Sequence, residues 1–246
     1  MLRPFLPLAI LALGVTGTLI HAAGASSGPI GGIAWSYRAE PEPRLQVVRE
    51  GMNSTFDPAD LPEIMDALAA ASLRSPGEAV SFSLPREAGA LACSGRTTGA
   101  GEAEGTCRFD ASESYLAALA ERGLRPEDDA ELLALALVDA RTALVDGLSR
   151  AGFRLEKAQD LVAVAALDVS AAYAAELRGA GLPINDLEDL IAARALELDP
   201  AWLSEMAEAG YPDLTVEQAI QMRALDVTPD YARRMKQVAA ALGEPM

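Results

Sequence analysis

The stretch that decides the fold runs from residue 200 to 228 and reads PAWLSEMAEAGYPDLTVEQAIQMRALDVT. Trp202 and Met206 stand four positions apart, which places both on one face of a helix. Gly210 follows, and glycine takes the left-handed conformation that ends a helix without strain. Thr215 then opens a second helix, with a glutamine three positions later in a capping-box pattern. The stretch therefore predicts a helix, a short turn and a second helix.

The same pattern recurs along the chain with a period of 29 residues. The glycine column is occupied by Gly123, Gly152, Gly181 and Gly210. Eight positions earlier stand Tyr115, Leu144, Tyr173 and Trp202, and Tyr231 continues this column. Four positions before the glycine stand Leu119, Leu148, Leu177 and Met206, continued by Met235. Several columns at one period indicate a repeat, and one hairpin cannot bury its apolar face alone. We predict a stack of αα-hairpins over residues 111–246 with the aromatic column in its core.

Two units depart from this pattern. The position three before the aromatic column is a good N-cap in four of five units, namely Ser112, Ser170, Asp199 and Thr228. The second unit has Arg141 there without a neighbouring glycine or proline, which predicts one unbroken helix from about Pro126 to Ala151. The fifth unit has Ala239 in the glycine column. We expect it to form a terminal cap whose amphipathic helix closes the stack.

Residues 30–110 have the short apolar period of β-strands. The strand-like segments are Ile33–Tyr37, Leu45–Val48, Val80–Leu84, Ala90–Cys93 and Cys107–Phe109. Ala39 to Pro43 predicts an exposed turn between strands. One helix interrupts the strands, because Asp57 and Pro58 suit its start and the apolar positions that follow have helical spacing; these are Leu61, Ile64, Met65 and Leu68. The region therefore predicts a small antiparallel α+β domain.

Cys93 and Cys107 are the two cysteines of the chain, and each lies in a strand-like segment. A disulfide across a β-hairpin is the favoured interpretation, and a redox-active pair is the alternative. The glycine-rich residues 99–105 lie between the cysteines. They lack lysine and contain two glutamates, so we predict a hairpin tip and not a phosphate-binding loop.

The N-terminal residues resemble an export signal. Arg3 precedes an uncharged apolar run, and Ala23 to Ala25 offers the small residues that a signal peptidase reads. We therefore expect residues 1–25 to be a signal peptide. A retained membrane anchor is the alternative, and it would be the chain's only link to a membrane. Either way the rest of the chain lies outside the cytoplasm, in the periplasm if the signal is cleaved.

Composition narrows the chemistry. The 246 residues carry a net charge of −16, which argues against nucleic-acid partners. His21 is the one histidine and lies in the export segment, so its removal would exclude histidine-based catalysis and histidine-ligated metals. Acidic clusters at Asp128 and Asp186 fall where helices begin, and capping is favoured there over weak Ca²⁺ binding. We expect no cofactor, no metal and no catalytic residue.

Three functions are consistent with the sequence. A stack of helical hairpins offers an extended acidic surface, which favours a non-catalytic protein that binds a partner in the bacterial envelope. The second is binding of a small ligand or glycan on the β-rich domain through Trp35, Tyr37 and Arg38, although these rings are also suited to packing on the predicted helix. The third, less favoured, is a hydrolase that uses two carboxylates.

The repeats also resemble a known group of sequences. Residues 200–228, continued by PDYARRMKQ, are similar to helical repeats in exported proteobacterial proteins and in the extracytoplasmic tails of some BlaR1-like M56-family metallopeptidases. FSLPREAGALACSGRTTGAGEAEGTCRFD resembles the β-rich segment before those repeats. The peptidase itself is absent, since the chain has no HExxH motif. The resemblance implies an envelope protein that accompanies a sensor or regulatory system, with a membrane sensor peptidase as its partner.

Overall fold

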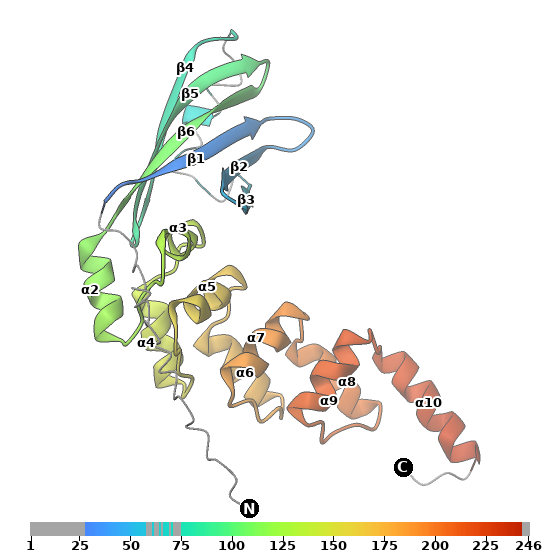
Figure 1. Cartoon of the computed structure of the whole chain (residues 1–246). Coiled ribbons are helices and arrows are strands. Elements are labelled where there is room, and N and C mark those ends of the chain that lie inside the picture. The colour runs from blue at the N-terminus through green and yellow to red at the C-terminus, as the bar shows by residue number, and fades with distance from the viewer. Residues whose placement is uncertain are drawn as a thin grey trace, which may run out of the picture.

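The structure is a computed structural model that describes residues 28–57, 61, 64, 66–68, 70 and 75–242. The expected export segment, residues 1–25, lies outside the described residues, and so do Pro58 and Met65 of the predicted helix. The described chain consists of an antiparallel sheet followed by a row of helices (Figure 1).

Six strands form one antiparallel sheet in the order β3-β2-β1-β6-β5-β4. Their bounds are β1 Ile30–Arg38, β2 Arg44–Arg49, β3 Met52–Phe56, β4 Ala79–Arg86, β5 Gly89–Gly99 and β6 Glu102–Ala111. Tight connections join β1 to β2 to β3 and β4 to β5 to β6, and the central pair β1 and β6 joins the two halves. The predicted turn at residues 39–43 is confirmed.

One face of the sheet is buried. Along β1, Ile33, Trp35 and Tyr37 are buried whereas the residues between them are exposed, as the alternation of side chains in a strand requires. Leu61, Ile64 and Leu68, from the segment between β3 and β4, are at most 4% exposed and belong to the same core cluster as the buried residues of β1. Ile64 and residues 66–68 are helical, in agreement with the predicted helix. The opposite face of the sheet is open.

The strands differ from the sequence prediction in two places. β3 was not predicted, because MNSTF lacks an apolar alternation; Glu50 and Gly51, both at positive φ, form the two-residue turn that pairs it with β2. The predicted tip at residues 99–105 is also too long. The turn is confined to Ala100 and Gly101, and the residues after it belong to β6.

The predicted disulfide is confirmed. Cys93 on β5 and Cys107 on β6 are directly opposite each other in the ladder, with Cα atoms 4.0 Å apart. Both are buried on the covered face of the sheet. The disulfide therefore links two neighbouring strands of the same hairpin.

Nine helices follow β6 within the described residues. Their bounds are α2 Glu113–Glu121, α3 Asp129–Leu137, α4 Thr142–Arg150, α5 Ala158–Ala166, α6 Ala171–Gly179, α7 Leu187–Ala195, α8 Pro200–Glu208, α9 Val216–Ala224 and α10 Pro229–Leu242. They form a row that leads away from the sheet, with α2 and α3 beneath it and α10 at the far end (Figure 1). Contacts join alternate helices, as between α3 and α5 or between α8 and α10.

The predicted helix caps are confirmed. Ser170 and Asp199 each accept a hydrogen bond from the backbone N–H three residues later, and Thr215 and Gln218 form a capping box. Asp128 and Asp186 also cap helices, as expected of the acidic clusters. The four glycines of the glycine column follow the first helices of the hairpins, with φ values of 79°, 92°, 91° and 100° at Gly123, Gly152, Gly181 and Gly210.

The predicted unbroken helix from Pro126 to Ala151 is wrong, because α3 ends at Leu137 and α4 begins at Thr142. Asp139 adopts the left-handed conformation at φ 50°, and Arg141 is extended. Acidic residues end α5, α7 and α9 in the same way, at Asp168, Glu197 and Asp226. Aspartate tolerates this conformation better than most residues other than glycine. The cap that starts α4 comes from outside the helical part.

Aromatic side chains link three helices, α2, α6 and α8, to the chain that follows. The Tyr115 and Tyr173 hydroxyls donate to the carbonyl oxygens of Ala140 and Leu198 at 2.7 and 2.6 Å. The indole of Trp202 donates to the carbonyl of Val227 at 3.2 Å. These three rings are at most 7% exposed, so their predicted core position is confirmed.

Candidate interaction surfaces

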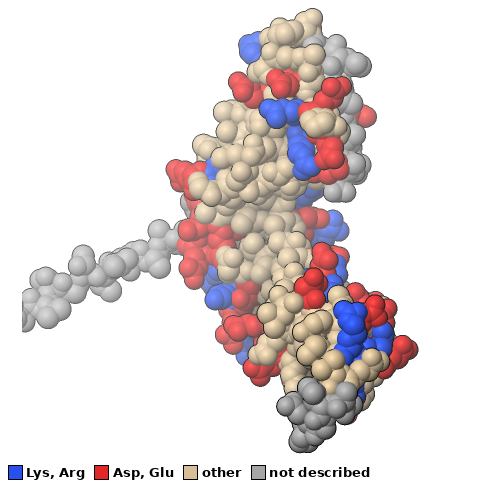
Figure 2. Space-filling model, turned by 90° about the vertical axis from the view of Figure 1, so that its right-hand side faces the viewer, with Lys and Arg blue, Asp and Glu red and all other residues tan. Residues whose placement is uncertain are grey.

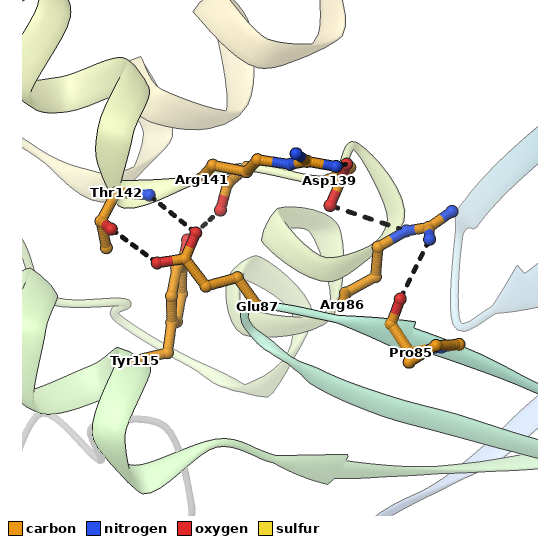
Figure 3. A network of polar contacts seen from close by, with 8 residues as sticks. Pro85, Arg86, Glu87, Tyr115, Asp139, Arg141 and Thr142 are labelled. Carbon is orange, nitrogen blue, oxygen red and sulfur yellow. Dashed lines mark hydrogen bonds and ion pairs between the residues drawn. The ribbon is translucent and has the colours of Figure 1, made fainter.

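The sheet and the helices meet in a polar network at the turn between β4 and β5 (Figure 3). The carboxylate of Glu87 accepts hydrogen bonds from the backbone N–H of Thr142 at 3.1 Å and from its hydroxyl at 2.5 Å. Asp139 lies beside them. Its carboxylate forms an ion pair with Arg141 at 2.6 Å and lies 3.8 Å from the Arg86 guanidinium. The network fixes the start of α4 against the sheet.

Tyr115 lies at the centre of this network. Burial raises the pKa of its hydroxyl, and the negative charges of Glu87 and Asp139 raise it further. The tyrosine therefore stays neutral, and its hydroxyl donates a hydrogen bond to the Ala140 carbonyl. Because these side chains contact one another and the backbone of the helical part, we interpret this network as a structural junction (Figure 3).

Basic side chains join successive helices by binding carbonyl oxygens at helix ends. Arg194 on α7 donates to the Leu167 carbonyl after α5 at 3.0 Å, and Arg223 on α9 donates to the Leu196 carbonyl after α7 at 3.0 Å. Helix C-termini carry partial negative charge, which favours a cation there. Sequence analysis did not predict this role for the arginines. Their spacing, 29 positions, was the available signal.

The first helices are joined in a similar way. Arg178 on α6 donates to the Ala151 carbonyl at 3.0 Å and lies 4.7 Å from the centre of the Phe153 ring. Lys236 on α10 donates to the Gly210 carbonyl at 2.8 Å. Between α2 and α4 the link is an ion pair, in which Arg122 binds both oxygens of Asp146 at 2.8 Å. This hydrogen bond lowers the pKa of Asp146.

Exposed apolar side chains gather at the far end of the row of helices. Among the described residues, the large apolar side chains that are exposed are Val48 in the sheet and Leu225, Tyr231, Met235 and Val238 at this end. Leu225 is 77% exposed and the other three are 45–50% exposed. We call these four residues the end face. Figure 2 views the molecule from this side and shows uncharged surface beside basic groups near its lower end.

The end face bears on two expectations, the core position of Tyr231 and the closing of the stack by the last helix. Tyr231 continues the aromatic column, but it is 48% exposed and not in the core. The fifth unit was expected to form a terminal cap, and α10 is a single helix there that continues through Ala239 to Leu242. It covers α8, and its own outer side is left open to solvent.

The second surface is the open face of the sheet. A hollow of about 270 Å³ is lined there by Ser36, Arg38, Arg44, Gln46, Thr98 and Glu102, among others. A larger hollow of about 770 Å³ continues from it past Ser94 and Arg96. Arg38 pairs with Glu102 at 3.3 Å.

Trp35, Tyr37 and Arg38, predicted as one ligand face, do not lie on the same side of the sheet. Trp35 and Tyr37 are 2% and 7% exposed on the covered face, whereas Arg38 lies on the open face. The Trp35 ring lies against Gly105, its neighbour in the ladder, and donates to the Ser94 carbonyl at 3.2 Å. Neighbouring residues of a strand point to opposite faces, which separates the three side chains.

The described residues hold no cluster of three or more histidine, cysteine, aspartate or glutamate side chains arranged for a metal ion. No helix among them has the length and hydropathy needed to cross a bilayer. Comparisons with protein-family models, with curated protein sequences and with solved structures gave no match.

Proposed function

We propose that the chain is an exported, non-catalytic protein of the bacterial envelope that binds another protein through the end face. The observation that carries this proposal is the exposure of Leu225, Tyr231, Met235 and Val238 together at one end of the molecule. Contiguous exposed apolar side chains are typical of interaction sites. Aromatic and methionine side chains, such as Tyr231 and Met235, are also enriched in protein–protein interfaces.

Tyr231 and Met235 of the end face are exposed, whereas the residues at equivalent positions of α6 and α8 are buried. We propose that the helices form a stack of 29-residue units, in which Tyr173 and Trp202 correspond to Tyr231. Those two rings are buried, and each donates a hydrogen bond to a carbonyl at the end of its own unit, just before the next unit begins. Tyr231 and Met235 have the same chemistry but remain exposed. A partner that covers them would restore the environment of the earlier units.

The location outside the cytoplasm has separate support. The disulfide between Cys93 and Cys107 suggests an oxidising compartment, because cytosolic thiols are kept reduced. We propose that residues 1–25 are the signal that directs the chain there. The resemblance of the repeats to metallopeptidase tails suggests a membrane sensor peptidase as the partner.

Photo-crosslinking in living cells tests this proposal. A photoreactive amino acid at Met235 is expected to give a crosslink to one discrete envelope protein. The same amino acid at Val48, an exposed apolar position on the sheet, is the matched control and is expected to give none. If Met235 gives no crosslinked protein in the envelope, or gives only the pattern of Val48, the proposed function is wrong.

A second candidate function rests on the open sheet face. The hollow beside Arg38, Arg44 and Gln46 offers hydrogen-bond donors of the kind that bind sugars or carboxylates. A panel of envelope glycans would test it, with binding followed by calorimetry and by the Arg44→Ala variant. Unchanged heats across the panel would remove this candidate.

A further inference from the structure

We infer that the partner of the end face is an amphipathic helix whose apolar stripe is flanked by acidic residues. This inference rests on the proposed function and adds to it the secondary structure and the charge of the partner. It is carried by the way the earlier helices pack and by the charge of α10.

The packing argues for a helix. Within the chain, α4 contacts α6, α6 contacts α8 and α8 contacts α10, so each of these helices packs on the next one along the row. Leu177 on α6 and Met206 on α8, which stand at equivalent positions of the two helices, are fully buried. Met235 occupies the corresponding place on α10 and has a methionine's ability to adapt to a partner. The end face therefore continues an interface that the molecule already makes between helices.

The charge argues for acidic flanks. α10 carries three basic residues and one acidic residue, whereas the whole chain has 20 basic and 36 acidic residues. Arg233 is paired with Asp230 in the same helix, and Lys236 binds the Gly210 carbonyl. Arg234 is exposed beside the apolar residues. Complementary charge raises the association rate and the specificity of such an interface.

A second copy of the chain fits this surface less well. Apart from Val48, the exposed large apolar residues among those described belong to the end face itself. Pairing two end faces would bring Arg234, which lies beside the apolar residues, towards the same residue of the other copy, and like charges in an interface are unfavourable.

An anionic membrane also fits the end face less well, although it combines apolar and negatively charged groups as an acidic amphipathic helix does. The acidic excess lies outside α10, and charges within about 8 Å of a membrane surface are still felt at physiological salt. A bilayer would meet much of that acidic surface, whereas a single docked helix meets α10 and the end of α9.

Two synthetic peptides serve as probes. Both are stapled helices with the same leucine and methionine stripe, and one has glutamates beside the stripe where its twin has lysines. Calorimetry with the full chain is expected to show that the glutamate peptide binds about tenfold more tightly than the lysine peptide. Raising the salt concentration is expected to reduce this difference.

Three variants connect the binding to the end face. Met235→Asp is expected to abolish binding of the glutamate peptide, and Arg234→Glu is expected to reverse the preference between the peptides. Val48→Asp, on the sheet, is the control and is expected to change neither. Circular dichroism and a cooperative unfolding transition verify that each variant is folded.

The inference is overturned if the two peptides bind equally, if neither binds, or if Met235→Asp leaves binding unchanged. Light scattering that finds a dimer which Met235→Asp dissociates would assign the surface to a second copy instead. Cosedimentation with phosphatidylglycerol vesicles, lost in the same variant, would assign it to a membrane. A crosslink from Met235 to an envelope protein, with neither peptide bound, would leave the proposed function standing and remove this inference alone.

Discussion

The carboxylate of Glu87 caps a helix that begins 55 residues later in the chain, at Thr142. It occupies the place that a serine or aspartate side chain takes at the start of other helices in this protein. Arg141, the residue at the N-cap position of α4, has no side-chain cap bond of its own. The turn between two strands therefore supplies the hydrogen bonds that the helical sequence lacks.

Removing this carboxylate is expected to destabilise the protein. For Glu87→Ala we expect a loss of about 1 kcal/mol in the free energy of unfolding, the usual effect of losing an N-cap. Urea unfolding followed by circular dichroism measures it. Glu104→Ala, at an exposed position of the sheet, is the control and should have no effect.

A double-mutant cycle with Thr142→Ala distinguishes the cap from a general effect of the negative charge. If Glu87 acts through Thr142, the two substitutions together cost less than the sum of the single costs. Strict additivity of the two would contradict the capping role.

The disulfide is expected to contribute about 3 kcal/mol, because it closes a loop of 14 residues in the unfolded chain. The double variant Cys93→Ala, Cys107→Ala should unfold at a correspondingly lower denaturant concentration. Adding a reducing agent should bring the wild-type protein to the same midpoint and leave the double variant unchanged. A double variant as stable as the oxidised wild type would refute this prediction.

Two glycines are expected to respond to alanine with opposite signs. A Cβ at Gly105 would lie 2.1 Å from the Ser94 carbonyl oxygen and 2.7 Å from the Trp35 indole nitrogen, so Gly105→Ala is expected to cost about 1–3 kcal/mol. Gly147 lies inside α4 with open space around it. Gly147→Ala should stabilise the protein by about 0.5–1 kcal/mol, because alanine is the better helix former. Thermal unfolding of both variants tests the pair, and equal shifts would contradict it.

The buried hydroxyl of Tyr173 is expected to make stability depend on alkaline pH. Burial raises its pKa from 10.0 to about 12 in the folded protein. An unfolded tyrosine titrates first, so this contribution is complete below about pH 10 and is lost as the pH rises towards 12.

Tyr173→Phe separates this effect from the other tyrosines. At neutral pH the variant should lose about 1 kcal/mol with the hydrogen bond to the Leu198 carbonyl. Between pH 10 and 12 its stability should fall less steeply than that of the wild type. Tyr231→Phe, at an exposed ring, should match the wild type at both ends of this range. Parallel pH profiles for Tyr173→Phe and the wild type would disprove the assignment.

Much of the helical part was predictable because helix boundaries are encoded locally. Ser170, Asp199 and Thr215 cap the helices that follow within a few residues, and the column glycines end them. The break before Thr142 was not predictable, because its cap comes from the sheet. Local sequence cannot reveal a hydrogen bond that depends on the tertiary fold.

The sheet and the candidate surfaces were harder to predict. β3 is an edge strand without an apolar face, and its strongest signal was the turn at Glu50 and Gly51. Tyr231 is exposed because no further helix packs on the outer side of α10 among the described residues. The aromatic column does not reveal which of its members lies at the end of the row. Trp35 looked like a ligand-binding residue because the sequence does not reveal that Gly105, its neighbour in the ladder, makes room for its ring.

The pairing of β1 with β6 also sets an order of assembly. Ile33 is the neighbour of Cys107 in the ladder, and Arg38 is the neighbour of Glu102, so the two halves of the sheet join residues far apart in the chain. Such distant contacts form slowly, whereas hairpins of neighbouring helices form quickly. When the chain is synthesised from its N-terminus, β1 therefore cannot pair with β6 until β6 has been made. The strand that completes the sheet also carries Cys107, so oxidation of the cysteines and closure of the sheet become available at the same stage of synthesis.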